Sequence, residues 1–192
     1  MDTLDKGTYA LVLHLKCREE IAVGKLGTFS FPAGYYLYVG SALGPGGLDA
    51  RLARHRRCDK KLHWHIDYLL EHTQLLEVWS AVSTARRECL WAQAARRLPG
   101  SETPVPGFGS SDCRCPSHLI YLARKPSCEE FTAYLSAPPG MDDSVEKYSS
   151  GGSPQLVWGL LACKLTPREV HPEQVRDSAA SKWGSVPERD VF

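Results

Sequence analysis

The sequence predicts an α/β fold, in which a small mixed β-sheet is flanked by helices and followed by a weakly structured C-terminal tail. Along the first two-thirds of the chain, β-rich and helix-rich segments follow one another in the order β-β-α-α-β-α-β. The 192 residues, 43% hydrophobic and 23% charged, suffice for one domain with a hydrophobic core. After residue 126 the periodic signal fades. We therefore expect a globular domain over residues 1–126 and a partly flexible extension over residues 127–192.

Four segments have the composition of β-strands. Tyr9, Leu11 and Leu13 fall on one face of a period-two pattern, which indicates a strand with a buried side. Residues 17–31 contain two glycines and are expected to form a hairpin-like excursion or a further strand. The predicted strands cover residues 7–15, 33–41, 76–83 and 117–124.

Three segments have helical composition. A glycine-rich loop at residues 43–47 leads into the first of them. The third is expected to begin after a cap at Ser83 or Thr84 and to end before Pro99-Gly100. The predicted helices cover residues 48–57, 61–72 and 85–98.

The charge is distributed unevenly. Residues 1–126 contain 17 Lys+Arg and 12 Asp+Glu, whereas residues 127–192 contain 6 and 10. The first part is therefore the candidate for binding a polyanion, and the acidic extension could mask it. Removal of residues 137–192, which begin with a linker-like composition, is then expected to tighten DNA binding at low salt.

Targeting signals are not evident. No apolar run approaches the length that crosses a bilayer, and the N-terminal residues lack the basic start and apolar stretch of a signal peptide. The seven cysteines are an odd number and widely scattered, unlike a disulfide scaffold. A cytoplasmic protein with free thiols and no membrane partner is expected.

Cys113 and Cys115, followed by His118, form a partial zinc signature. The spacing matches the usual zinc motifs poorly, and no second close pair completes it. Cys89 or Cys58 could approach in space. A metal- or thiol-dependent protein centred on these residues is a low-ranking hypothesis.

Short motifs in a fixed order carry the functional signal. Gly7-Thr8-Tyr9 lies in the first strand and Tyr38-Val39-Gly40-Ser41 closes the second, while Glu88 lies near the start of the third helix. Arg51, Arg54 and His55 lie on the first helix. This series resembles the GIY-YIG nuclease superfamily. It is most similar to the branch named domain of unknown function DUF123, through GYYLYVGSA at residues 34–42, the Arg54-His55 pair, HWHIDY at residues 63–68 and GFGSSDC at residues 107–113.

The resemblance implies a metal-dependent endonuclease, a hydrolase that cuts DNA phosphodiester bonds by direct attack of water. Glu88 would hold Mg²⁺ or Mn²⁺, and Tyr9 would be a base or orient the water, which requires positive charge nearby to lower its pKa. Arg51 would bind phosphate, and Tyr38 would be a second phenol. His55, one turn from Arg51, could act as a base at its ordinary pKa. The predicted substrate-binding residues are Gly40, Ser41, Arg54, His63, His65 and Asp112.

Other interpretations of these residues remain open. The tyrosines could be core residues, Glu88 could only favour its helix dipole, and Asp67 could make a structural hydrogen bond with a histidine. The superfamily often has a late asparagine, for which Asp112 is at best a substitute, and the gap between Tyr9 and Tyr38 is longer than typical. The alternative function is a non-catalytic nucleic-acid-binding module. Because the branch is found fused to DNA repair enzymes, repair proteins are candidate partners by analogy.

Overall fold

The computed structural model describes residues 5–135 and 145–148, which belong to one compact unit. The predicted α/β fold is confirmed, although the sheet is antiparallel where a mixed one was predicted. Residues 136–144 and 149–192 of the predicted extension lie outside the described residues. Among the described residues, no helix has the length and hydrophobicity required to cross a bilayer.

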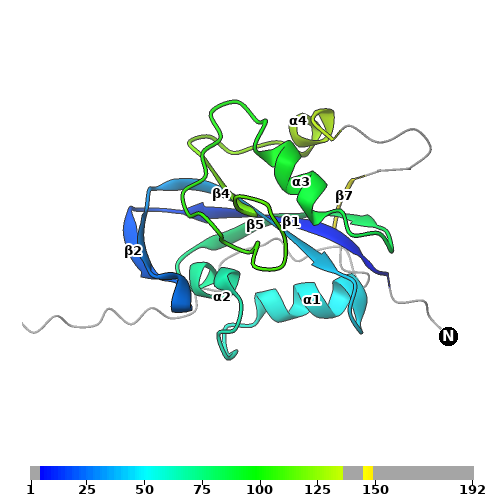
Figure 1. The fold of residues 1–192 in the computed structure, drawn as a ribbon, viewed down its shortest axis with the longest axis horizontal. Coiled ribbons are helices and arrows are strands. Elements are labelled where there is room, and N and C mark those ends of the chain that lie inside the picture. Colours follow the sequence, from blue (N-terminus) through cyan, green and yellow to red (C-terminus); the bar gives the residue numbers. More distant parts are fainter. Residues whose placement is uncertain (1–4, 136–144, 149–192) are drawn as a thin grey trace, which may run out of the picture. The chain divides into compact units, whose positions relative to one another are not determined.

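A five-stranded antiparallel sheet forms the centre of the unit (Figure 1). The strand order is β6-β4-β1-β5-β7, so that the first strand in sequence lies in the middle and pairs with β4 and β5. The five strands are β1 (Gly7–Leu15), β4 (Gly34–Ala42), β5 (Gln74–Val82), β6 (Leu119–Leu122) and β7 (Glu146–Lys147). The four predicted strands are thereby confirmed, with small changes at their ends.

The segment between β1 and β4 forms a separate two-stranded hairpin. Strand β2 (Glu19–Ala22) pairs with β3 (Thr28–Phe31), and a short 3₁₀ helix (Gly24–Leu26) connects them. The expected hairpin-like excursion is confirmed. It accounts for the long spacing between the two tyrosine motifs, because the intervening residues fold back on themselves.

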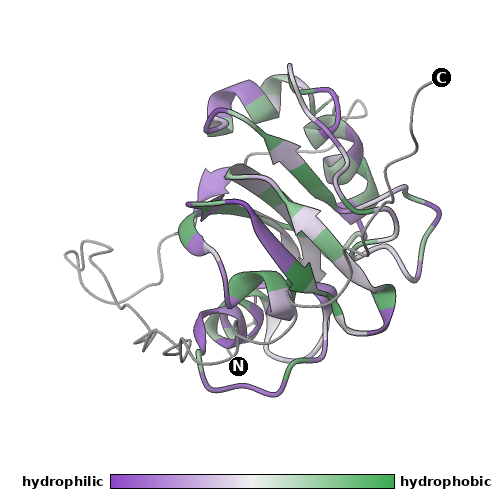
Figure 2. Ribbon diagram, turned by 90° about the vertical axis from the view of Figure 1, so that its left-hand side faces the viewer, coloured by the Kyte–Doolittle hydropathy of each residue, from purple (hydrophilic) through white to green (hydrophobic). Residues whose placement is uncertain are grey.

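Helices cover both faces of the sheet. In Figure 1, α1 (Gly47–Arg56) and α2 (His65–Leu70) lie below it, and α3 (Glu88–Ala95) and α4 (Cys128–Ala133) lie above it. Figure 2 shows hydrophobic and hydrophilic residues alternating along these helices, as expected for elements with one buried side.

Strand β1 is buried on both of its faces. Leu11 and Leu13 belong to the hydrophobic cluster on the side of α1 and α2. Ala10 and Val12 belong to the cluster that contains Trp91 of α3 and Phe131 of α4. The strand therefore reads as an almost continuous apolar run, and its two faces fix the positions of two separate helical layers.

Helix α2 begins later than predicted because of one side chain. The Asp67 carboxylate accepts hydrogen bonds from the backbone N–H groups of His63 and Trp64, both at 3.0 Å. These bonds hold the preceding residues in an extended conformation, so the helix begins only at His65.

Helix α3 also begins later than predicted, at Glu88. Ser83 caps a turn by accepting from Ala85 N–H at 3.1 Å, and the residue that precedes the helix, Arg87, gives no side-chain cap. The prediction that Ser83 or Thr84 caps the helix itself is wrong.

The ordered fold continues past residue 126. Phe131 of α4 is fully buried, and it contacts Trp79 and Trp91 with ring centroids 5.4 Å apart in each case. Glu146–Lys147, within the segment predicted as a linker, pairs with β5 as β7. A single buried aromatic residue in a short helix carries little periodic signal, so sequence patterns do not reveal α4.

Candidate active site

A cavity of about 220 Å³ lies at the edge of β4, and its lining is mostly polar. It contains four of the five predicted catalytic side chains, those of Tyr9, Tyr38, Arg51 and Glu88. The remaining lining residues are Val39, Gly40, Ser41, Trp64, Arg86, Gly109, Asp112 and His118.

The sheet topology explains how these residues meet. Tyr9 and Tyr38 lie on the α1 side of the sheet, whereas Glu88 begins α3, a helix of the opposite layer. Strand β6 pairs with β4 only as far as Tyr38. The edge of β4 at Gly40 and Ser41 therefore carries no further strand, and the cavity extends past this edge to Glu88.

Each cavity tyrosine packs against a glycine. Tyr9 lies directly opposite Gly40 in the β1–β4 register, and a Cβ atom at Gly40 would stand 2.5 Å from the Tyr9 hydroxyl. Gly109 has a φ of +71°, and a Cβ atom there would stand 2.9 Å from the Tyr38 ring. Any residue larger than glycine at position 40 or 109 would therefore clash with the neighbouring phenol.

Tyr9 is hydrogen-bonded to His55, with 2.7 Å between Oη and Nε2. Burial, with Tyr38 nearby, raises the pKa of Tyr9 well above 10, although Arg51 and Arg54 act in the opposite direction. Burial, followed by the charge of Lys60, lowers the pKa of His55 to about 3. Both groups are therefore neutral at neutral pH, and the expectation that His55 keeps its ordinary pKa is wrong because the imidazole is desolvated.

Two arginines of α1 stack over one aromatic ring. The Cζ atoms of Arg51 and Arg54 lie 4.3 and 3.9 Å from the Trp64 ring centroid. Arg51 reaches the cavity from this position. A cation held over a ring keeps its N–H groups available, so Arg51 is oriented toward an anion in the cavity.

Arg54 has a different role from Arg51. Its two terminal nitrogens each donate to the Asp67 carboxylate at 2.9 Å, and Lys60 Nζ lies 3.3 Å from the same carboxylate. Burial alone would raise the pKa of Asp67, but the hydrogen bonds from Arg54, Trp64 and His63 hold it well below its usual range. Asp67 thus joins α1 to α2 as a structural group, and His63 takes part through its backbone N–H.

Glu88 is buried and carries one unpartnered oxygen. Arg86 Nε lies 3.0 Å from Oε1, whereas Oε2 has no hydrogen-bond partner among the described residues. The same arginine donates to Asp112 at 2.6 Å. Arg86 therefore links the two carboxylates of the cavity, and it is itself 62% exposed.

A family model matches residues 8–137, and its description is "Domain of unknown function DUF123". The chain belongs to the DUF123 family. Neither a curated protein nor a solved structure gives a significant match. The DUF123 match begins in β1 and ends beyond α4, so it includes both helical layers and every residue of the cavity.

The cavity of this DUF123 domain brings together most of the predicted site residues. Gly40, Ser41 and Asp112 line it with the four catalytic candidates, and His55 is linked to it through Tyr9. Arg54 and His63 are not among its lining residues. His65 supports the site indirectly, because its Nδ1 accepts from Gly109 N–H at 3.1 Å.

Sequence patterns missed two residues of the DUF123 cavity, Arg86 and Trp64. Trp64 was quoted only as part of the HWHIDY motif, and Arg86 was not singled out. The i,i+2 relation of Arg86 to Glu88 is a signal that could have drawn attention to it, but only the fold shows that its side chain returns to the cavity. His118, considered only for zinc, also lines the cavity.

Proposed function

We propose that this DUF123 domain is a metal-dependent endonuclease of the GIY-YIG type, which hydrolyses phosphodiester bonds of DNA in repair or processing. The observation that carries the proposal is the convergence of two phenols, a guanidinium and a carboxylate on one cavity of about 220 Å³. These residues come from β1, β4, α1 and α3. Convergence from four separate elements favours a shared chemical task over four independent packing roles.

Tyr9 and His55 provide a path for the proton of the attacking water. In the neutral tautomer that carries its proton on Nδ1, His55 accepts the phenol proton at Nε2, and the phenol oxygen then faces the cavity with its lone pairs free. Tyr9 then accepts the proton of the water as it passes its own proton to His55. The negative charge of a phosphate bound in the cavity would favour the imidazolium form of His55.

Arg51 binds the scissile phosphate in this proposal. Its guanidinium can form two parallel hydrogen bonds to phosphate oxygens, and Trp64 holds it in place. Ser41 and the backbone of Gly40 border the same space and leave room for the substrate to approach closely.

Glu88 is the residue that would hold the cation. Its buried, unpartnered Oε2 and the nearby Asp112 are hard oxygen donors that suit Mg²⁺ or Mn²⁺, which keep several waters. When bound, the ion would neutralise phosphoryl oxygens and stabilise the leaving oxygen. Arg86 has to turn away from Glu88 to make room, and its exposure allows this.

Cleavage of plasmid, branched and single-stranded DNA with Mg²⁺ or Mn²⁺ tests the proposal. The parent should cleave at least one substrate, and Glu88→Gln should lower the rate by about 100-fold or more while DNA binding persists. Glu20→Gln, on the exposed side of β2, is the matched control and should cleave like the parent. Equal cleavage by all three proteins would refute the role of Glu88.

One observation favours the alternative, a nucleic-acid-binding module without turnover. Arg86 lies between Glu88 and Asp112 and neutralises the carboxylates that would hold the cation. If this arrangement persists with DNA bound, Arg86 adds a phosphate ligand in place of the metal. In that case the parent and Glu88→Gln bind DNA equally and neither cuts it.

A further inference from the structure

Three cysteines and one histidine gather beside the candidate active site. Cys113, Cys115 and His118 come from the loop before β6, and Cys89 comes from the first turn of α3. Their donor atoms all lie within 4.8 Å of one another. Cys113 Sγ lies 3.4 Å and Cys89 Sγ 4.0 Å from His118 Nε2.

These separations are close to those of a tetrahedral zinc site. With Zn–S bonds of about 2.3 Å and a Zn–N bond of about 2.0 Å, neighbouring donor atoms lie about 3.5–3.8 Å apart. A contraction of the longest separations by about 1 Å would complete that geometry. We propose that Cys89, Cys113, Cys115 and His118 bind one structural Zn²⁺.

The loop brings three of the four ligands together by itself. Gly107 N–H donates to Pro116 O at 2.7 Å, and His118 N–H donates to Phe108 O at 2.8 Å, so that the loop closes on itself. Cys89 completes the set from α3, 24 residues before Cys113 in the sequence. This separation explains why the sequence shows only a partial signature.

The chemistry of the donors favours zinc over magnesium. Thiolates and an imidazole are soft or borderline ligands that select Zn²⁺, whereas Mg²⁺ prefers oxygen. Four protein ligands leave no open position for a water, which identifies the site as structural. Cys58, the other candidate fourth ligand, is not part of the cluster.

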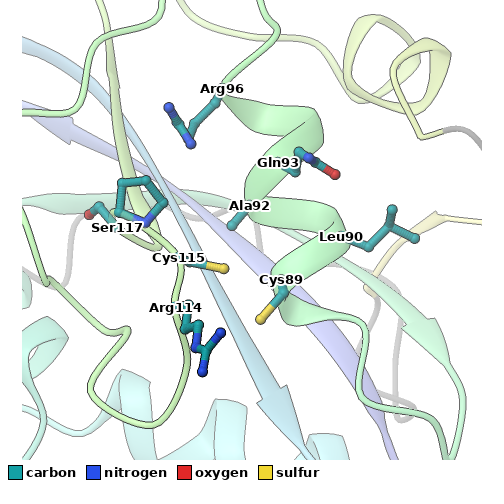
Figure 3. Close-up of a pocket in the computed structure, with 9 residues that line it drawn as sticks. Cys89, Leu90, Ala92, Gln93, Arg96, Arg114, Cys115 and Ser117 are labelled. Carbon is teal, nitrogen blue, oxygen red and sulfur yellow. The ribbon is translucent and has the colours of Figure 1, made fainter.

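The surroundings suit the charge and the entry of the ion. Three thiolates with Zn²⁺ carry a net negative charge, and two arginines lie close by. Figure 3 shows Cys89 and Cys115 with their sulfur atoms between α3 and the loop, and Arg96 and Arg114 above and below them. All four residues border a groove of about 530 Å³, which gives an ion access from solvent.

The zinc site would also hold the two sides of the neighbouring cavity in fixed positions. Cys89 directly follows Glu88, Cys113 directly follows Asp112, and His118 lines the cavity itself. Tying α3 to the loop therefore fixes the distance between the two carboxylates. The proposal does not depend on the nuclease activity, since the same bridge would hold the two elements in a binding module.

Metal analysis of the full chain, purified without chelator, tests the proposal. The parent should contain one zinc per chain, with X-ray absorption showing three sulfur ligands and one nitrogen ligand. Cys89→Ser and Cys115→Ser should each lower zinc affinity by more than about 100-fold. Cys17→Ser and Cys58→Ser, two exposed thiols outside the cluster, are the controls and should retain it.

Cobalt substitution keeps the test decisive if a variant fails to fold. The parent reconstituted with Co²⁺ should show a thiolate charge-transfer band and intense visible bands, the signature of tetrahedral coordination. Zinc bound only through oxygen or nitrogen, no bound zinc in the parent, or a disulfide that includes Cys89 would each overturn the proposal. None of these measurements involves DNA, so their failure is distinct from that of the proposed function.

Discussion

Tyr9 and His55 are both neutral at neutral pH, and one hydrogen bond joins them. Burial shifts the pKa of the phenol upward and that of the imidazole downward, so that neither is charged in the free protein. The 2.7 Å hydrogen bond between them allows a proton to move only if both groups respond together. Either side chain alone is a poor base at neutral pH.

Tyr9→Phe and His55→Gln should therefore act as a unit. Each single substitution is expected to lower the cleavage rate by about 100-fold or more, because the proton path is broken. The double variant should be little slower than either single one. Single-turnover cleavage measures this, with Tyr35→Phe, a β4 tyrosine outside the cavity, as control. Losses that multiply would show that the residues act independently.

Gly40 tests the position of the same phenol. In Gly40→Ala the added methyl group would stand 2.5 Å from the Tyr9 hydroxyl, so Tyr9 must move. We expect a loss of about 1–3 kcal/mol in the free energy of unfolding, together with loss of cleavage. Urea titration and a cleavage assay measure the two effects.

Gly44→Ala is the matched control for this substitution. Gly44 has no atom within 4 Å of the added Cβ and does not have a positive φ. Its substitution should change stability by less than about 0.5 kcal/mol. Equal effects at both glycines would contradict the argument from close packing.

At the scale of elements, Asp67 joins α1 to α2. Its fully buried carboxylate accepts from Arg54 and from the backbone N–H groups of His63 and Trp64. The same network places Trp64 under Arg51. The connection between the helices thus determines both the start of α2 and the orientation of the proposed phosphate ligand.

Asp67→Asn should destabilise the protein by about 3 kcal/mol at pH 7, because Arg54 and Lys60 lose their anionic partner. The folded-state pKa of Asp67 lies below the unfolded value of about 3.9, so the stabilisation is present above that pH. It is lost as the pH falls further. Urea titrations should therefore show the stabilities of parent and variant converging below about pH 4.

The control for this experiment is Asp59→Asn, in the exposed loop between the two helices. This substitution should leave the free energy of unfolding nearly unchanged both at pH 7 and below about pH 4. Parallel stability curves for the parent and Asp67→Asn down to pH 3 would contradict the assigned pKa shift. Protonation of His55 also lowers stability on acidification in both proteins, and it does not cancel fully in the difference, because the Asp67 carboxylate itself raises the pKa of His55.

At the scale of the whole molecule, the basic excess of residues 1–126 remains the basis for expecting a polyanionic partner. Residues 149–192 contain five Lys+Arg and five Asp+Glu, so the acidic excess of the extension lies in residues 127–148. There, Glu130 on α4 pairs with Arg124. Masking of the basic face by the tail stays a prediction.

The salt dependence of DNA binding tests the electrostatic part of the proposal. If Arg51 contacts a phosphate, Arg51→Ala should lower the slope of log K against log salt by about 1. Arg124→Ala, which removes an exposed arginine outside the cavity, should leave the slope unchanged. Fluorescence anisotropy at several salt concentrations measures both. An unchanged slope for Arg51→Ala would exclude that contact.

The sequence by itself determined the central strands, the hairpin and α1. In these segments local residue preference, periodicity and turn residues agree, so neighbouring residues suffice to define the element. It also pointed to Tyr9, Tyr38, Arg51 and Glu88, because the order of their motifs along the chain can be read without the structure. For the weakly patterned α4, and for the true start of α2, local preference was insufficient.

Only the tertiary structure decided which of these residues meet. The open edge of β4 lets Glu88 of one layer reach the phenols of the other, and this edge exists because β6 pairs with β4 only as far as Tyr38. The shifted pKa of His55, the link from Arg86 to Asp112, and the approach of Cys89 to Cys115 all arise between residues far apart in sequence. Burial and proximity are properties of the packed chain, and no local pattern contains them.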